Sequence, residues 1–593
     1  MEAKLIIDLR KTDLPAKTLV YIYVVGLVSG SNDTFYYLDK NFNPKIMAIS
    51  DNTQAAQTFP GMKQLSTEAQ KTIAPSYPLP WADWSIPVKV KKSLELNLGA
   101  INTTNIPTLG TGASAFSGRI YISVGVPRLP FTVQTNGYTE PVFDGTLGKL
   151  GSPGWLTQYD WIEFSYDSSG KFNGNTTQVN QFGLPLTLTG KPVSGETHRQ
   201  GIFNTDRNTI LSNIAAANTP SLGGAKAMIP VPAGCAAAYP TGTNYLRAIS
   251  PITEIGNSSS SPLDTYFDAN IKTAYEAWHS TPLVTHDPSS GAYTGVVFPV
   301  PAVTLLGQQN PVTQPTPANY PTGSLVFYEG NYPTLVDLVT VLQSSNPPAP
   351  AFFLIGSTQN TISSNDIWQC VNSLASGSAA QKNVGKMIAA AFNRGVMVAP
   401  DGTVSTYLND GTCATLASTF YPTSGTFNAW AKAFQGYNRN GLAYGFPYDD
   451  VCDQNPSIAL VASSIRIVLR KFGIPTPFIR WTRDDKWLYG ADVSAQWASK
   501  KKREMVLTVS FGPEAKADST TITKEIDLSV VRPGPESVTI QQGSVLLNLN
   551  FTWQNPAKGQ KNPKINFNGN IVESGVANVA VDSCLCVTVD PAS

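Results

Sequence analysis

Short apolar runs separated by turn-forming residues dominate the chain. Runs rich in Val, Ile, Thr, Tyr and Phe, such as residues 119–126, 160–167 and 183–190, are interrupted by Gly, Pro, Asn or Asp at intervals of about ten residues. Regular spacing of this kind is typical of the strands of a sandwich or barrel. The pattern therefore predicts a protein that is mainly β.

Helical periodicity interrupts the strands in the middle of the chain. Residues 261–280 have Ser261 as an N-cap candidate and Pro262 at the first helical position. Apolar residues follow at helical spacing, namely Phe267, Ile271, Tyr275 and Trp278. Similar patterns predict three further helices, within residues 365–377, 379–395 and 426–439.

These patterns divide the chain into three parts. Residues 1–195 are β-rich. Residues 196–490 mix helices with strands and include a Pro-rich stretch from 299 to 350, which we interpret as surface loops. Residues 500–593 follow a basic cluster and return to strand patterns, which predicts a C-terminal β-sandwich.

The composition is poor in charge. The 593 residues include 42 Lys plus Arg and 41 Asp plus Glu, for a formal net charge of +1. Nucleic acid is not an expected partner, because no basic excess is present to neutralise phosphates. The hydrophobic content of 42% excludes a chain that is disordered throughout. A net charge near zero also favours self-association.

The N-terminal segment and the cysteines carry few signals. No secretory signal peptide is evident, and the apolar run Leu19–Val28 is too short to span a bilayer, so we expect no membrane span. The six Cys do not form a disulfide framework, and Cys584 and Cys586 are expected to be buried thiols of a strand. We therefore expect neither a metal site nor a cofactor.

Residues 160–190 carry the most informative polar pattern. Because strand side chains alternate between faces, Glu163, Ser165 and Asp167 are expected to project together. A turn-like segment follows, so the next strand folds back and brings Asn180 near Glu163. A carboxylic acid opposite another polar group on an open sheet suits glycoside hydrolysis. An exposed Glu on a strand can equally be only solvated.

Several motifs together resemble glycoside hydrolase family 64. DWIEFSYD followed by NTTQVNQFGLPLTL is similar to the family's core motif, and VYIYVVGL, SGRIYISVG, NYLRAISP and GLAYGFPYDDV occur in a similar order. The resemblance spans roughly residues 15–480. It implies an extracellular β-1,3-glucanase in which a thaumatin-like β-barrel or sandwich and a mixed α/β domain form a wide groove. Residues after about 500 lie outside the resemblance.

The resemblance implies one catalytic residue and one departure. Glu163 matches the general acid of an inverting cleavage. The family's general base is the Asp of a Val-Asp pair ahead of a GLP turn, whereas here Val179 precedes Asn180. An amide cannot accept a proton at ordinary pH. Loss of a general base typically costs roughly 10²- to 10⁴-fold in rate.

The resemblance also implies substrate-binding positions on the strand pair. Ser165 stands where Thr is usual, and Asp167 stands where Asn is usual. Phe172 lies near the expected aromatic sugar platform, and Thr177 is assigned to the same groove.

A second set of binding residues lies in the YGFPYDD segment. Tyr444, Asp449 and Asp450 fit a groove wall, because aromatic faces stack on sugars and carboxylates accept hydrogen bonds from hydroxyls. Either Asp could instead cap local backbone amides.

Three functions remain open at this stage. The first is recognition of a neutral polysaccharide, β-1,3-glucan, with hydrolysis weakened or lost. The second is an active inverting endo-β-1,3-glucanase, with Asp167 as a substitute base. Asp167 lies about 13 Å along the strand from Glu163, beyond the roughly 6.5–9.5 Å between inverting carboxylates. The third is a structural or toxin-associated assembly protein that reuses the scaffold.

Overall fold

The computed structural model divides the chain into two compact units, Met1–Ile474 and Pro475–Ser593. Among the described residues of the first unit, side chains are described as well, except at 225–226, 303–305, 308–310 and 440. In the second unit only the backbone is described. The described residues are 3–30, 33–55, 79–139, 154, 156–203, 205–231, 239–240, 243–257, 261–301, 303–305, 308–310, 321–357, 359–409, 417–452, 454–474, 480–483, 486–499, 504–512, 521–527, 535–542, 545–554, 564–573, 579–580 and 585–588.

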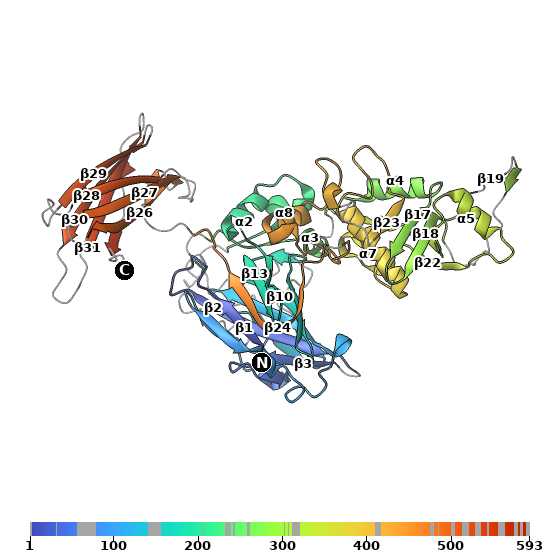
Figure 1. The fold of residues 1–593 in the computed structure, drawn as a ribbon, viewed down its shortest axis with the longest axis horizontal. Helices are drawn as coiled ribbons and strands as arrows, with labels where there is room; N and C mark the ends of the chain where they lie inside the picture. The colour runs from blue at the N-terminus through green and yellow to red at the C-terminus, as the bar shows by residue number, and fades with distance from the viewer. Residues whose placement is uncertain are drawn as a thin grey trace. The chain divides into compact units, whose positions relative to one another are not determined.

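A curled 12-stranded sheet forms the β-rich part of the first unit (Figure 1). Its main path runs β14-β13-β24-β11-β10-β7-β2-β3-β4, while β1 pairs with β24 and β6, and β5 pairs with β2. The strands are β1 (Lys4–Asp8), β2 (Leu19–Val28), β3 (Thr34–Leu38), β4 (Pro44–Ile46), β5 (Ile86–Lys89), β6 (Ser93–Asn97), β7 (Phe116–Val124), β10 (Gln158–Tyr166), β11 (Lys171–Thr176), β13 (Leu186–Pro192), β14 (His198–Gly201) and β24 (Ile458–Leu469).

Alternation along β10 separates the core from the open face of this sheet. Ile162, Phe164 and Tyr166 are buried in the core inside the curled sheet, together with side chains of β2, β7, β11 and β24. Glu163 and Ser165 lie between them in sequence and remain partly exposed. The expected division of β10 into an apolar and a polar face is therefore confirmed at these positions.

A second aromatic cluster covers part of the outer face of the sheet. It includes Trp161 of β10, Tyr121 of β7 and Tyr23 of β2, packed against Trp84 and Phe131. The hairpin of β8 (Thr132–Gln134) and β9 (Gly137–Thr139) lies at this cluster. The outer face is therefore apolar toward this hairpin, whereas it is polar around Glu163.

The rest of the first unit combines small sheets with helices. A five-stranded sheet has the order β22-β21-β18-β17-β23, and a three-stranded sheet has the order β12-β16-β15. The strands are β12 (Gln181–Phe182), β15 (Met228–Pro230), β16 (Tyr245–Ile249), β17 (Leu283–Asp287), β18 (Gly291–Val297), β19 (Val303–Leu305), β20 (Gln308–Asn310), β21 (Leu325–Glu329), β22 (Pro350–Leu354) and β23 (Tyr407–Asn409). The helices are α2 (Arg207–Ala215), α3 (Pro251–Asn257), α4 (Asp268–Trp278), α5 (Leu335–Leu342), α6 (Ser364–Gln369), α7 (Ala379–Asn393) and α8 (Ala429–Tyr437).

The four expected helices are present as α4, α6, α7 and α8, but the first begins later than expected. Residues 262–267 form turns, and α4 starts at Asp268. The Ser261 amide donates to the Asp264 carboxylate, and the Ser261 hydroxyl accepts from the Leu263 amide. These bonds follow the pattern of an N-cap, but the six residues after Ser261 form turns before the helix begins. None of the helices in the described part is long and apolar enough to cross a membrane.

Strand pairing crosses the boundary between the expected parts 1–195 and 196–490, whose division stays a prediction. Strand β24 lies within the second of these ranges, yet it pairs with β1, β11 and β13 of the first. The compact unit also ends at Ile474. A strand that returns more than 250 residues after its partners cannot be assigned from local pattern.

In the described part of the second unit, the strands form two antiparallel sheets. The first has the order β25-β26-β27-β28, and the second consists of β29, β30, β31, β32 and β33. The strands are β25 (Arg480–Arg483), β26 (Lys486–Ser499), β27 (Glu504–Gly512), β28 (Thr521–Asp527), β29 (Pro535–Gln542), β30 (Val545–Gln554), β31 (Lys564–Glu573), β32 (Val579–Ala580) and β33 (Leu585–Thr588). The expected sandwich over residues 500–593 stays a prediction. Cys586 lies on β33, whereas Cys584 lies outside the described residues.

Candidate active site

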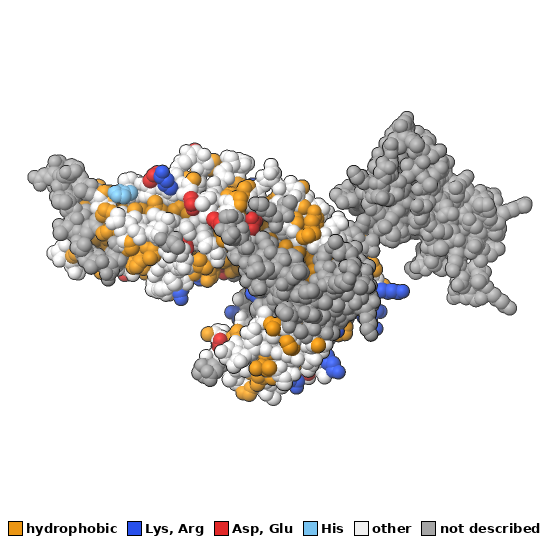
Figure 2. Space-filling model, turned by 180° about the vertical axis from the view of Figure 1, so that it is seen from behind, with side chains coloured by type: hydrophobic (Ala, Val, Ile, Leu, Met, Phe, Trp, Pro, Cys, Tyr) orange, Lys and Arg blue, Asp and Glu red, His pale blue; other side chains and the backbone are white. Residues whose placement is uncertain are grey.

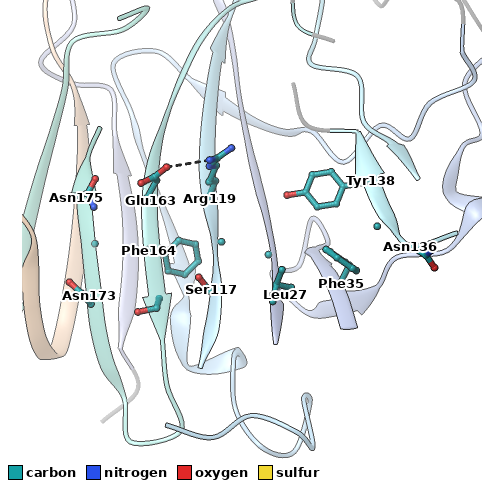
Figure 3. A pocket seen from close by; sticks show the side chains of 15 residues that line it. Leu27, Phe35, Ser117, Arg119, Asn136, Tyr138, Glu163, Phe164, Asn173 and Asn175 are labelled. Carbon is teal, nitrogen blue, oxygen red and sulfur yellow. Dashed lines mark hydrogen bonds and ion pairs between the residues drawn. The ribbon is translucent and has the colours of Figure 1, made fainter. Parts of the chain in front are cut away.

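A groove with a cavity volume of about 610 Å³ crosses the open face of the curled sheet beside Glu163 (Figure 3). Its lining comes from β2, β3, β7, β10, β11 and the β8–β9 hairpin, and consists of Gly26, Leu27, Phe35, Ser117, Gly118, Arg119, Asn136, Gly137, Tyr138, Glu163, Phe164, Ser165, Asn173, Gly174 and Asn175. Around Glu163 the lining consists of side-chain amides and hydroxyls and of Arg119, which forms an ion pair with Glu163. The rings of Phe35 and Tyr138 lie at the other end. The groove therefore has a polar end and an aromatic end.

Glycines form part of the groove floor. Gly26 pairs with Gly118, and Phe164 on β10 pairs with both Gly118 and Gly174. A Cβ atom on Gly118 would lie 2.1 Å from the carbonyl oxygen of Val25. Only glycine fits this close approach of β7 and β2. The missing side chain of Gly118 is on the core face of the sheet, because Gly118 pairs with the core residue Phe164.

The Glu163 carboxylate accepts two hydrogen bonds at the polar end. Its Oε1 atom lies 3.3 Å from Nη2 of Arg119 and 3.4 Å from Nε1 of Trp161. The Glu163 side chain is 34% exposed, so it is held by its neighbours and remains open to the groove. Asn175 is its cross-strand partner on β11.

Arg119 is a site residue that sequence reasoning missed. Its guanidinium lies over the Trp161 ring, 5.2 Å from the centroid, and Nη1 donates to the Tyr121 hydroxyl at 3.3 Å. These contacts orient Arg119 toward Glu163, its direct cross-strand partner. The signal in the sequence was a single cation within the apolar run of β7.

Ser165 lies in the groove as expected, in a row with Asn173 and Ser117. Its cross-strand partners are Asn173 on β11 and Ser117 on β7, and all three line the cavity. This row runs parallel to the row of Asn175, Glu163 and Arg119. The two rows give the polar end its amide and hydroxyl groups.

Asp167 is held in the turn between β10 and β11. Its Oδ1 atom accepts hydrogen bonds from the amide and hydroxyl of Ser169, at 2.9 and 2.6 Å, and from the Lys171 amide at 3.0 Å. Burial alone would raise the pKa of Asp167, but these hydrogen bonds outweigh it and lower the pKa. The carboxylate thus stabilises the turn, and it does not line the cavity.

The predicted sugar contacts of Phe172 and Thr177 do not fit the structure. Phe172 is fully buried and stacks on Phe164 in the core, with ring centroids 5.9 Å apart. The reason is register, because Phe172 pairs with the core residue Tyr166. Thr177 is also buried, at 2% exposure, and its hydroxyl accepts from the Val179 amide.

Asn180 lies on the segment between β11 and β12 and is half-buried. Its carbonyl oxygen accepts hydrogen bonds from the Ser250 amide at 2.9 Å and the Thr253 hydroxyl at 2.7 Å. Asn180 is not one of the residues that line the cavity. These bonds fix the backbone of the segment against the start of α3.

A buried carboxylate ties this segment to the strand of Glu163. Oδ2 of Asp160 on β10 accepts from the amides of Gly183 and Leu184, at 2.8 and 3.1 Å. Burial raises the pKa of Asp160 to about 7, although these amides and Arg247 oppose the rise. The GLP turn that follows Asn180 is therefore anchored three residues before Glu163 in β10.

Tyr444 connects a distant segment to the same region. It forms a parallel bridge with Thr177, and the Gln178 amide donates to its carbonyl oxygen at 2.9 Å. Burial, and then the charges of Asp450 and Glu163, raise the pKa of the Tyr444 phenol. The phenol therefore lies within electrostatic reach of both carboxylates.

The two neighbouring aspartates of this segment have different environments. Asp450 is exposed, whereas Asp449 is fully buried in an ion pair with Arg394, with 3.0 Å between Oδ1 and Nη2. Oδ2 of Asp449 also accepts from the Gly445 amide at 3.1 Å. Burial raises the pKa of Asp449 to about 7, against the pull of Arg394. The expected sugar contact is therefore compatible with Asp450 and not with Asp449.

Metal-binding groups are not assembled in the described part of the chain, where no cluster of three or more His, Cys, Asp or Glu could hold an ion. Cys452 is disulfide-bonded. Cys370 is a buried free thiol, and burial raises its pKa to about 12.

Comparisons with solved structures show which fold this chain shares. A β-1,3-glucanase domain (GH64) from Clostridium beijerinckii has 18% identity and a TM-score of 0.52, and the match covers 79% of this chain and 98% of that chain. A laminaripentaose-producing β-1,3-glucanase solved in complex with laminaritetraose has 17% identity and a TM-score of 0.53, with 79% and 99% covered. At these identities the likeness shows a shared fold. No curated protein sequence matches the chain significantly.

A sequence-family comparison gives the more direct result. The model of glycoside hydrolase family 64, described as Beta-1,3-glucanase, matches residues 5–324 and 349–465. These segments include Glu163 and both rows of polar groove residues. Since they make up more than half of the chain, the protein belongs to glycoside hydrolase family 64, the β-1,3-glucanases.

Proposed function

We propose that the groove beside Glu163 binds β-1,3-glucan and that its ability to hydrolyse the glucan is weakened or lost. Family membership and the fold shared with a glucanase solved with laminaritetraose support glucan binding or hydrolysis. The finer proposal rests on Asn180, which follows Val179 ahead of the GLP turn and which we assign, from the resemblance, to the position of the family's general base. An amide at this position cannot remove a proton from water.

The chemistry of the groove suits a neutral polysaccharide. Asn173, Asn175, Ser117 and Ser165 offer donors and acceptors for sugar hydroxyls, and rings lie at the other end. Among the described residues on the face shown in Figure 2, most side chains are uncharged, and charged ones are scattered among them. This agrees with the composition of the whole chain, in which 14% of the residues are charged and the formal net charge is +1.

The environment of Asp167 supports weakened hydrolysis. Asp167, the substitute base considered from the sequence, is already bonded to three donors within its own turn. Loss of the general base by itself accounts for a rate loss of roughly 10²- to 10⁴-fold.

An active inverting endo-β-1,3-glucanase is the second candidate. One observation favours it: Asp450 is an exposed carboxylate on the segment of Tyr444, which forms a bridge with Thr177 directly after β11. In this candidate Glu163 is the general acid, and Asp450 takes the place of the missing base. Inverting cleavage needs a carboxylate pair of this kind with room for a water between them.

Laminarin binding and laminarin cleavage, measured on the same protein, test the proposal. We expect saturable binding by calorimetry and little release of reducing ends by the unmodified protein. Glu163→Gln should weaken binding, whereas Glu95→Gln, which removes another exposed strand carboxylate paired with Lys4, should not. Turnover that disappears in Glu163→Gln would establish the second candidate. Absence of both binding and turnover would favour the structural or toxin-associated class.

A further inference from the structure

The groove continues from Glu163 across the sheet to a pair of aromatic rings. Phe35 on β3 and Tyr138 on β9 line the same cavity as Glu163, and Figure 3 shows them at the opposite end from Asn175. The path from β10 to β3 passes over β7 and β2. Three strand spacings amount to about 14 Å, so several sugar units would be needed to reach the rings from Glu163.

The ring pair is fixed in place by its surroundings. Phe35 and Tyr138 meet edge to face, with centroids 6.1 Å apart and an interplanar angle of 81°. Behind Tyr138 lie Phe131 and Trp84, at 6.0 and 6.4 Å between centroids. Both rings of the pair are nevertheless partly exposed to the groove. A platform whose rings are already ordered loses little entropy when a ligand binds.

The turn of the β8–β9 hairpin fits closely against this platform. Gly137 has φ +131°, and a Cβ atom there would lie 3.3 Å from the Phe35 ring. Asn136, next to it, is exposed and offers an amide at the edge of the rings. An aromatic face beside a polar amide matches a sugar, which has an apolar ring face and a rim of hydroxyls.

A second depression extends the groove toward the edge of the sheet. Its volume is about 710 Å³, and it shares Phe35, Asn136 and Gly137 with the first. It continues along Ile46 and Met47 at the end of β4. The two depressions are therefore neighbours, and Phe35 of the ring pair lines both of them.

We propose that Phe35, Tyr138 and Asn136 form a distal sugar-binding surface for the same β-1,3-glucan chain that Glu163 contacts. The inference rests on the proposed function, and it makes affinity depend on chain length. A short oligosaccharide occupies the polar end alone, whereas a longer one also stacks on the ring pair. We expect one ring face to contribute about two- to tenfold in affinity, the range found for a single contact between two aromatic rings.

Binding of laminaritriose and laminarihexaose, measured by calorimetry, tests the distal surface. The variants are Phe35→Leu and Tyr138→Leu, which keep an apolar side chain but remove the ring face. Tyr407→Leu serves as the control, because Tyr407 is 49% exposed and lies outside the groove lining. Phe35→Tyr retains the ring and should keep the affinity of the unmodified protein, even if a Leu variant folds poorly.

We expect each Leu variant to weaken laminarihexaose binding about two- to tenfold while leaving laminaritriose binding and the control unchanged. Full hexaose affinity in both Leu variants, with normal binding by the unmodified protein, would overturn the distal surface and leave the proposed function intact. If the unmodified protein binds neither oligosaccharide, both proposals fail.

Discussion

The adjacent residues Asp449 and Asp450 should respond to substitution in opposite ways. Asp449 and Arg394 are 0% and 1% exposed, and the carboxylate also accepts from the Gly445 amide. Asp449→Ala leaves a buried guanidinium without its counter-charge, which costs about 3–5 kcal/mol of unfolding free energy. Asp450→Ala removes an exposed carboxylate and should change the unfolding free energy by less than about 0.5 kcal/mol.

Equilibrium unfolding in urea at pH 8, above the pKa of about 7 for Asp449, measures this difference. The unfolding midpoint of Asp449→Ala should fall at an unchanged slope, which is the signature of lost stability. Asp449→Asn, which keeps an acceptor for the Gly445 amide, should lose less stability and still bind laminarin. Asp450→Ala should unfold like the unmodified protein and bind laminarin more weakly. The reasoning would be refuted by an Asp449→Asn variant of normal stability that no longer binds glucan.

Three further predictions follow from other contacts. A hydrogen bond from Arg10 lowers the pKa of Asp8 from 3.8 to about 2. The Asp8 carboxylate therefore contributes about 1–2 kcal/mol to the unfolding free energy, a figure discounted because Arg10 is half exposed. This contribution is present above pH 3.8 and is lost as the pH falls through 2, so acid unfolding curves of Asp8→Asn should lack the loss. Arg119→Met should change stability by less than about 1 kcal/mol but weaken laminarin binding in calorimetry, because its carboxylate partner on β10 loses its orientation. Gly118→Ala should lower stability by about 3 kcal/mol in urea unfolding, whereas Gly30→Ala, where a Cβ would meet nothing within 4 Å, should be neutral.

Local sequence pattern predicted the strand of Glu163 well. Alternation placed Ile162 and Phe164 in the core and Glu163 and Ser165 on the open face, as the structure shows. The same rule, applied across the turn, would have placed Phe172 in the core opposite Tyr166. The resemblance implies a groove position for Phe172, but the register of β11 places its ring in the core.

Contacts between distant segments could not be predicted in this way. Arg394 pairs with Asp449, 55 residues away, and a pattern of single residues does not show which Asp is buried. The bridge between Thr177 and Tyr444 and the return of β24 to the curled sheet are of the same kind. Arg119 was visible as a cation within an apolar strand, but its partner became clear only from the pairing of β7 with β10.

The most direct test of the central claim is the initial rate of reducing-end release from laminarin by Asn180→Asp, compared with the unmodified protein. If Asn180 limits hydrolysis, restoring a carboxylate should raise the rate by roughly 10²-fold or more, and Glu163→Gln in the same background should abolish the gain. An unmodified protein that already cleaves laminarin as fast as Asn180→Asp would contradict the claim that hydrolysis is weakened or lost at this position.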